Sequence, residues 1–419
     1  MKLINGLFEF LNKSPSAYHA VDTVAKILDG QGYSLITEGE DLKLCDGGKY
    51  YVKKNGSSLV AFRYNTRAKG FMICSTHSDS PTFKVKGDLK SGVYTKLDVE
   101  KYGGTIYYTW FDRPLSVAGR VYVKCDTGIE CRLVNVDRDI AVIPSVAIHM
   151  QRGVNDGCKF NPAVDLLPLV SLGNGGFTEL IANELSVKAE DIISHDLFLY
   201  NRDKAKLVGE DYVLSPRLDD LASAFSSLEA FLCATEKETI PVFAIFDNEE
   251  VGSATKQGAD SVFFSELLRE IAGDGYRKML ASSFMVSADN AHAKHPNHPE
   301  LSDANNFATL GGGVVIKYNA NQKYTTDAYS DAIFRKIAER SGARVQSYSN
   351  RADMQGGSTL GSIATTKLPI PTVDIGLPQL AMHSASETMS AKDVSNMTAA
   401  LTEFYSTRLF LNGDKTEII

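Results

Sequence analysis

The stretch FAIFDNEEVGS, residues 243–253, runs from an apolar segment typical of a buried strand into two adjacent glutamates and then a glycine. Neighbouring carboxylates repel each other, and a buried carboxylate needs a partner. A bound cation removes this difficulty, because one glutamate can bind the ion while the other stays beside it as a base. A solvated turn is the simpler interpretation of such a pair, so the rest of the chain has to decide between the two.

The composition is that of a soluble globular protein with two or three domains: 419 residues, 43% hydrophobic, with a formal net charge of −7. The chain has no long basic run, so we expect no nucleic-acid partner. Its apolar runs fall short of the roughly 18 residues that cross a membrane, so we expect no membrane partner. The six cysteines form no Cys-x-x-Cys pair and the first 20 residues lack a secretory pattern. We therefore predict a cytoplasmic protein with reduced thiols.

Hydrophobic periodicity predicts an α/β protein interrupted by a β-rich segment. Helical spacing over residues 3–30 is followed by apolar runs expected to form strands, and a final helix is expected over 394–411. Between about residues 84 and 211 the pattern changes to short alternating segments, such as 105–111 and 117–123. We predict a mostly parallel sheet covered on both faces, with an inserted β-rich dimerisation domain. The expected boundaries are 1–84 plus 212–419 for the first domain and 85–211 for the insert.

Potential metal ligands follow the expected strands, at the carboxyl ends where open α/β sheets place their sites. His77, the Glu249-Glu250 pair and Asp289 stand at three such ends, and Asp219 and His383 lie in loops. Nitrogen and oxygen ligands in this mixture suit zinc, or cobalt or manganese. With one bridging carboxylate, five ligands divide between two ions roughly 3.5–4 Å apart. The remaining glutamate would be a general base, and spacing alone leaves open which of the two it is.

Five motifs in this order resemble those of the aspartyl aminopeptidase family of dizinc exopeptidases. They are HSD at 77–79, PRLD at 216–219, DNEEVGS at 247–253, SADNAHAKHPN at 287–297 and QLAMHS at 379–384. The resemblance implies a zinc-exopeptidase fold and a homo-oligomer, a tetrahedral dodecamer in the family, built through the insert.

The resemblance also implies a role for each matched site residue. Asp219 would bridge two zinc ions, with His77 and Asp289 completing one site and Glu250 and His383 the other. Glu249 would be the general base and acid. Asp79 would orient the His77 ring, because a ligating imidazole is fixed by its second hydrogen bond.

Three further residues, Lys317, Tyr324 and His149, match positions near the family's substrate site, and Gly357 lies in a stretch that departs from the family's eukaryotic pattern. Lys317 would pair with an acidic substrate side chain, although it could also be a solvated lysine at a strand edge. Tyr324 would lie near that pocket. Gly357, in MQGGST at 354–359, would offer backbone amides at a helix start to an anion or an oxyanion. His149, in the insert, would contact substrate across a subunit interface or act as an additional metal ligand, and a structural histidine is the alternative.

We therefore predict a dinuclear zinc aminopeptidase that removes N-terminal residues, preferably Asp or Glu, from peptides with a free N-terminus. Its nucleophile would be a metal-bridging water activated by Glu249. A metal-dependent deacylase or amidohydrolase on the same core is one alternative, and it would accept acetylated substrates. A non-catalytic, self-assembling scaffold with structural metals is the other.

Overall fold

The computed structural model describes residues 1–171, 175–235, 237–412 and 414–419. It divides into two compact units. The larger unit comprises Met1–Asp79, Lys206–Met382 and Glu387–Ile419, and the smaller unit comprises Ser80–Ala205 and His383–Ser386. The division falls a few residues before the boundaries expected at 84/85 and 211/212, and the smaller unit also takes in a short segment near the C-terminal end.

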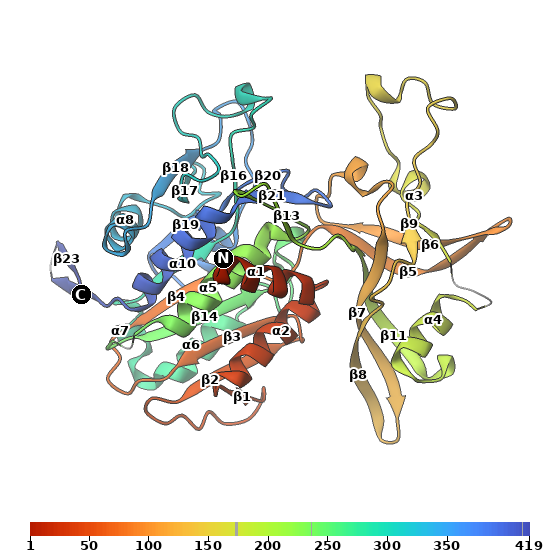
Figure 1. Cartoon of the computed structure of the whole chain (residues 1–419). Helices are drawn as coiled ribbons and strands as arrows, with labels where there is room; N and C mark the ends of the chain where they lie inside the picture. The colour runs from red at the N-terminus through yellow and green to blue at the C-terminus, as the bar shows by residue number, and fades with distance from the viewer. Residues whose placement is uncertain (172–174, 236, 413) are drawn as a thin grey trace. The chain divides into compact units, whose positions relative to one another are not determined.

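A nine-stranded sheet organises the larger unit (Figure 1). Its order is β1 (Ser34–Ile36), β2 (Lys49–Lys54), β3 (Ser58–Arg63), β14 (Ile240–Phe246), β4 (Phe71–His77), β15 (Phe284–Ala288), β19 (Thr372–Gly376), β17 (Val314–Tyr318), β18 (Val345–Ser349). The neighbouring strands β14, β4, β15 and β19 are mutually parallel. Strand β3 is antiparallel to both its neighbours, and β17 is antiparallel to β19. The sheet is therefore mixed, because the β2–β3 hairpin and the reversed β17 flank a parallel centre.

Helices cover both faces of this sheet. The larger unit contains α1 (Lys2–Lys13), α2 (Ala17–Gly30), α5 (Leu218–Cys233), α6 (Phe263–Ala272), α7 (Tyr276–Leu280), α8 (Ala328–Ser341), α9 (Leu360–Ala364) and α10 (Ala391–Tyr405). On β14, the ring of Phe243 packs against Phe231 of α5 at 6.2 Å, whereas Phe246 packs against Phe264 of α6 at 5.4 Å. Residues three apart on a strand point to opposite faces, so α5 and α6 lie on opposite sides of β14.

A second, smaller sheet stands beside the strand ends of the larger unit. Its order is β12 (Lys206–Val208), β13 (Tyr212–Ser215), β21 (Glu387–Ser390), β20 (Pro378–Leu380), β16 (Ala291–His292). These strands hold two to four residues, too few for a periodic pattern, and the sequence did not predict them. The helix expected over 394–411 was too long: α10 ends at Tyr405, and β22 (Leu409–Asn412) pairs with β23 (Lys415–Ile418) as a hairpin.

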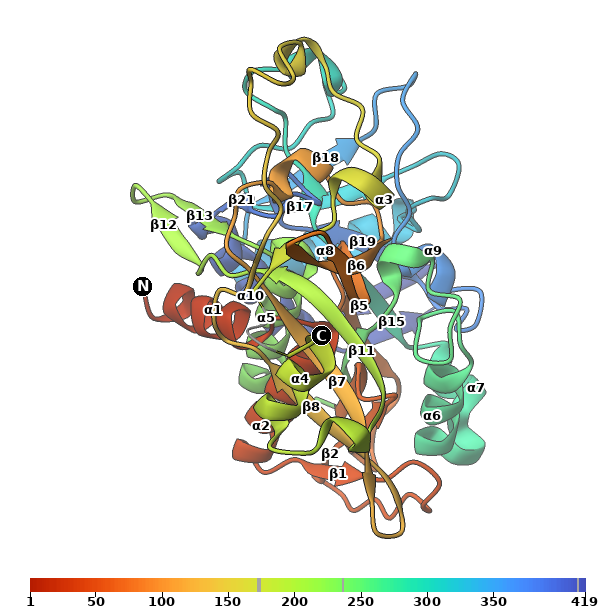
Figure 2. The same ribbon diagram turned by 90° about the vertical axis from the view of Figure 1, so that its right-hand side faces the viewer.

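The smaller unit is built on an antiparallel sheet of seven strands. Their order is β11 (Ile192–Asn201), β5 (Thr82–Ser91), β6 (Tyr94–Tyr102), β10 (Leu169–Val170), β9 (Ala141–Val142), β7 (Leu115–Cys125), β8 (Gly128–Asn135). Strand β11 pairs with both β5 and β7, so the sheet closes on itself. Helix α4 (Phe177–Leu185) lies against β5 and β8, and a short α3 (Pro162–Asp165) contacts β6 (Figure 2).

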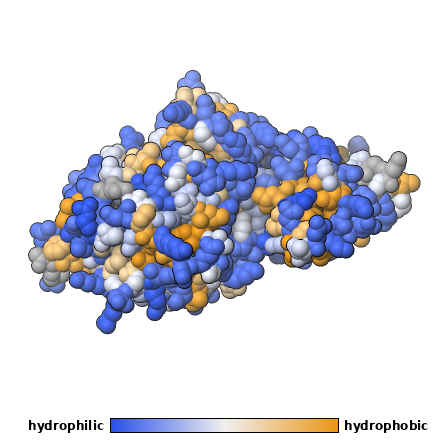
Figure 3. Space-filling model, turned by 90° about the horizontal axis from the view of Figure 1, so that it is seen from below, coloured by the Kyte–Doolittle hydropathy of each residue, from blue (hydrophilic) through white to orange (hydrophobic). Residues whose placement is uncertain are grey.

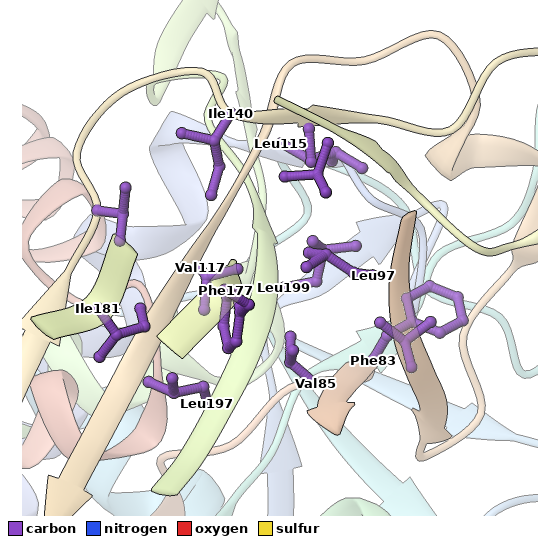
Figure 4. Close-up of a cluster of buried hydrophobic side chains, with 14 of the residues drawn as sticks. Phe83, Val85, Leu97, Leu115, Val117, Ile140, Phe177, Ile181, Leu197 and Leu199 are labelled. Carbon is purple, nitrogen blue, oxygen red and sulfur yellow. The ribbon is translucent and has the colours of Figure 1, made fainter. Parts of the chain in front are cut away.

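The core of the smaller unit is formed by alternating strand residues from both ends of this segment. Figure 4 shows Phe83, Leu97, Val117 and Leu199 among the side chains gathered there, with Phe177 of α4 added to them.

The strand expected over 105–111 is wrong: the chain forms a 3-10 helix, η1 (Tyr107–Trp110). The Trp110 ring is buried edge-on against Phe83 at 5.1 Å, and its indole N–H donates to Thr105 Oγ1 at 2.6 Å. A single-turn helix brings these two ends of the indole to their partners.

None of the helices that the structure describes is long and apolar enough to cross a membrane. On the face drawn in Figure 3, hydrophilic residues predominate and apolar residues gather in separate patches between them.

Candidate metal centre

Three parallel strands deliver their carboxyl ends to one edge of the larger sheet. Strand β4 ends at His77, β14 is followed by Asp247-Asn248-Glu249-Glu250, and β15 is followed by Asp289. Because β14, β4 and β15 are parallel, the residues at their carboxyl ends lie at one edge of the sheet, as expected.

Four buried side chains meet at this edge: His77, Asp219, Asp220 and Asp289, each with one ligand atom within 4.8 Å of the others. The Nδ1–H of His77 donates to the backbone carbonyl of Asp79 at 3.0 Å, which leaves Nε2 as the ring atom facing the carboxylates. That Nε2 lies 3.5 Å from Asp219 Oδ1 and 3.9 Å from Asp289 Oδ1. A ring fixed by a carbonyl on one nitrogen and facing carboxylates with the other has the arrangement of a histidine metal ligand.

The glutamate pair lies in the 3-10 turn η4 (Glu249–Val251), entered through Asn248 in the left-handed conformation with φ of 66°. Both glutamates have ligand atoms within 4.8 Å of one on His77. The carboxylate of Asp79 accepts the backbone N–H of Glu249 on Oδ1 and that of Glu250 on Oδ2, each at 3.2 Å. The same Oδ1 lies 3.5 Å from His77 Nδ1. Asp79 therefore links the end of β4 to the glutamate turn.

The buried carboxylates of this cluster carry strongly shifted pKa values. Burial, with repulsion from Asp289, raises the pKa of Glu249 to about 8. Burial raises the pKa of Asp289 to about 6 despite nearby Lys317, and it raises the pKa of Asp220 well above its usual range. Burial alone would lower the pKa of His77, but hydrogen bonds to Asp219 and Asp79 outweigh it and raise that pKa. Crowded buried negative charge is relieved by a cation, and the imidazole and carboxylate donors suit zinc.

Sequence reasoning missed Asp220 as a member of this cluster. Its side chain is fully buried, and Oδ2 accepts the backbone N–H of His77 at 3.2 Å. The peptide bond joining it to Asp219 is cis. The signal that could have identified it is a second carboxylate beside a predicted ligand at the start of a largely apolar helix.

His383 is the first residue of the short segment His383–Ser386 that belongs to the smaller unit. Its Nδ1–H donates to the carbonyl of Gly104 at 3.2 Å, and its own carbonyl accepts the Ile106 N–H at 2.9 Å. Donation from Nδ1 places the ring lone pair on Nε2, the tautomer that a metal ligand needs.

Lys317 is buried, with 2% of its surface exposed. Strand β17 pairs on both sides, with β18 and β19, so the alternative of a solvated lysine at a strand edge is wrong. Its Nζ donates to the carbonyls of Asp289 at 2.7 Å and Asn290 at 3.2 Å, and lies 3.8 Å from Asp289 Oδ2. The ammonium also stands over the ring of buried Tyr324, 5.2 Å from its centre. The structure therefore joins Lys317 and Tyr324 to the Asp289 turn.

Gly357 and His149 lie outside the clustered side chains described above. Helix α9 begins at Leu360 with Thr359 as its N-cap, so Gly357 precedes the helix rather than starting it. His149 is exposed in the smaller unit, on the loop between β9 and η2 (Val154–Asp156). The roles of an oxyanion donor for Gly357 and of a substrate or metal contact for His149 stay predictions.

Comparisons with known proteins agree along the whole chain. The family model of aminopeptidase I zinc metalloproteases (M18) matches residues 10–405. A probable M18 family aminopeptidase 2 of Clostridium acetobutylicum is 43% identical and covers 96% of this chain and 98% of its own. Its counterpart in Ectopseudomonas mendocina is 38% identical, covering 97% and 98%.

Solved structures show the same fold. A chain of the Ape4 and Nbr1 complex matches with a TM-score of 0.93 and 34% identity, over 96% of this chain and 85% of its own. The mApe1 dodecamer of S. cerevisiae matches with a TM-score of 0.83 and 25% identity, over 96% of each chain. With the His, Asp and Glu cluster at the edge of its main sheet, the chain belongs to the M18 family of zinc metalloproteases and is a metallo-aminopeptidase.

Proposed function

We propose that this metallo-aminopeptidase works with two zinc ions and removes N-terminal residues, preferentially Asp and Glu, from peptides. The observation that carries the proposal is the convergence of His77, Asp219 and Asp289 with a glutamate pair whose backbone Asp79 holds in place. A scaffold with structural metals has no need of a second, adjacent carboxylate at the same edge.

We assign the bridging position to Asp219, one site to His77 and Asp289, and the other to Glu250 and His383. The donors would also accept cobalt or manganese. Zinc bound there would supply Lewis-acid polarisation of the scissile carbonyl and lower the pKa of a coordinated water. The His77 and His383 tautomers, each fixed by a carbonyl on Nδ1, support this assignment.

Glu249 moves the proton in this proposal. It takes a proton from the attacking water and delivers it to the leaving amine, so it must change protonation state near neutral pH. Burial raises its pKa to about 8, because little solvent is present to stabilise its charge. The hydrogen bond from the Glu249 N–H to Asp79 holds the backbone while the side chain acts.

The test is Glu249→Gln, which keeps the size of the side chain and removes its basicity. We expect the variant to retain two zinc ions per subunit and to lose roughly 10²–10⁴-fold in kcat. Glu266→Gln, at an exposed position on α6, is the matched control and should behave as wild type. Full activity of Glu249→Gln would exclude the proposed role.

The preference for acidic residues rests on Lys317, with Tyr324 beside it. A buried ammonium is a strong partner for a substrate carboxylate. We expect Lys317→Ala to lower kcat/KM for Asp and Glu reporters about tenfold or more and for Leu reporters less, since a charged hydrogen bond contributes about 1.5–3 kcal/mol. Equal losses on all reporters would mean that Lys317 acts only through Asp289, and no loss on the acidic reporters would remove it from the pocket.

We further propose that the chain forms a homo-oligomer through its smaller unit, as a dodecamer. The similar yeast protein is described as a dodecamer. The smaller unit exposes large apolar side chains, among them Val93, Tyr94, Tyr108, Ile129 and Met150, some of which subunit contacts would cover. His149, next to Met150, would then reach substrate bound by a neighbouring subunit.

A further inference from the structure

A network of buried, hydrogen-bonded polar side chains lies next to the candidate metal ligands in the larger unit. It is formed by Asn290 after β15, Gln379 of β20 and Glu387 of β21, none more than 3% exposed, together with fully buried Ser223 of α5. Buried polar groups are costly unless their hydrogen bonds are made, so a connected set of this kind indicates a specific structural requirement.

Asn290 is the centre of the network. Its Nδ2 donates to the carbonyl of Leu218 at 2.7 Å and to Gln379 Oε1 at 2.9 Å. Its Oδ1 accepts the hydroxyl of Ser223 at 2.8 Å. The side chain therefore joins the turn that carries Asp289 to the beginning of α5.

Glu387 lies at one end of the network and determines which way its hydrogen bonds run. Its Oε2 accepts the backbone N–H of Asp219 at 3.0 Å, and its Oε1 lies 3.5 Å from Gln379 Nε2. A carboxylate accepts hydrogen bonds and donates none, so Gln379 must turn its NH2 group towards Glu387 and its oxygen towards Asn290. Asn290 must then present its NH2 group to Gln379 and to Leu218.

Two members of the network, Asn290 and Glu387, hold the same peptide group. The carbonyl of Leu218 and the N–H of Asp219 belong to one peptide plane, with Asn290 on the first and Glu387 on the second. The backbone of Asp289, the residue before Asn290, is held in turn by Lys317 on its carbonyl. Hydrogen bonds from Asn290, Glu387 and Lys317 thereby hold the backbone next to Asp219 and the turn that carries Asp289.

We propose that Asn290, Gln379 and Glu387 are positioning residues that set the separation of the Asp219 and Asp289 carboxylates and, through it, the affinity for metal. The inference rests on the proposed zinc ligation by those carboxylates. Outer groups that orient ligands typically account for 10- to 100-fold in metal affinity. None of the three residues needs to touch the substrate.

The experiment compares Gln379→Met with wild type as the full-length protein. Methionine keeps the volume of glutamine and removes both hydrogen bonds. We expect the Kd for zinc, measured by competition with a chromophoric chelator, to rise about 10- to 100-fold. The absorption spectrum of the cobalt(II) protein should change as well, because the ligand geometry shifts. Gln346→Met is the control. Gln346 is a hydrogen-bonded glutamine of β18 outside the network, so its replacement should leave the zinc affinity and the cobalt spectrum unchanged.

A folded Gln379→Met protein with wild-type zinc affinity and cobalt spectrum would overturn the inference, whatever its thermal stability. Should that variant fail to fold, Glu387→Gln decides: it keeps the acceptor for Asp219 but adds a donor that opposes the one on Gln379, and it should also weaken zinc binding. Unchanged affinity in Glu387→Gln would overturn the inference. Failure of the proposed function is separate, because wild type itself would then bind no zinc or cleave no peptide.

Discussion

Asp79 shows how much one side chain can do beside a metal cluster. The family resemblance implies that it orients His77; its backbone carbonyl accepts the Nδ1–H at 3.0 Å, and its carboxylate lies 3.5 Å from the same nitrogen. In addition, the two oxygens take the backbone amides of Glu249 and Glu250, one each. Asp79, two residues after the end of β4, thereby contacts both the His77 ring and the backbone of the glutamate turn that carries the proposed ligand and the proposed base.

Asp79→Asn tests this dual role. An asparagine has one acceptor oxygen, so one of the two glutamate amides loses its partner and the turn loosens. We expect zinc content to be retained and kcat to fall about 10- to 100-fold. Asp303→Asn is the control, because that carboxylate accepts the backbone amides of Asn305 and Asn306 on one oxygen, Oδ1, which an asparagine keeps. Wild-type kcat in Asp79→Asn would argue that the turn does not need this carboxylate.

At the scale of elements, the sequence predicted best where apolar runs are continuous. The strands expected to end at His77, before the glutamate pair and before Asp289 are present as β4, β14 and β15, because a buried parallel strand has an uninterrupted apolar sequence. Strand β5 was not predicted, because charged residues outnumber the apolar ones in it and an irregularity between Val85 and Gly87 interrupts the alternation. The metal cluster followed from strand ends, whereas Asp220, Asn290, Gln379 and Glu387 depend on tertiary contacts that no local pattern encodes.

The N-terminal helix pair carries a pH dependence of its own. His19 of α2 is largely buried beside Ser16, and burial lowers its pKa to about 4. Unfolding raises this value to about 6.5, so the unfolded chain binds more protons between these limits and stability falls as the pH drops through the window. We expect wild type to lose up to about 3 kcal/mol from this residue between pH 7 and pH 4.

His19→Asn removes that titration and keeps a group able to bond Ser16. The thermal midpoints of the two proteins, measured from pH 7.5 to 4.5, should converge on acidification as wild type loses the larger share. Curves that stay parallel over the whole range would show that His19 is not the group responsible.

At the scale of the whole molecule, metal binding and folding are coupled. The larger unit brings several carboxylates together where its strands end, and a bound cation would reduce their mutual repulsion. A ligand that binds only the native state stabilises it in proportion to the logarithm of its concentration over Kd, by about 4 kcal/mol at a thousandfold excess. The proposed zinc ions would therefore be part of the stability of the unit as well as of its chemistry.

Chelation followed by readdition of zinc measures this contribution. We expect dialysis against a strong chelator to lower the thermal midpoint of the larger unit and abolish peptidase activity together, and zinc to restore both. Scanning calorimetry on the two forms gives the shift. An unchanged midpoint in fully stripped protein would mean that the carboxylate cluster tolerates its own repulsion.

The position of β4 in the sheet has a consequence for biosynthesis. This strand is buried along its whole length between β14 and β15. Both partners are translated only after Ser80–Ala205, the main part of the smaller unit. The nascent chain must therefore carry an apolar strand without its neighbours while an entire sheet is synthesised behind it, the situation in which chains aggregate or engage chaperones. Early assembly of the smaller unit on the ribosome would shorten the distance that β4 has to search once β14 emerges.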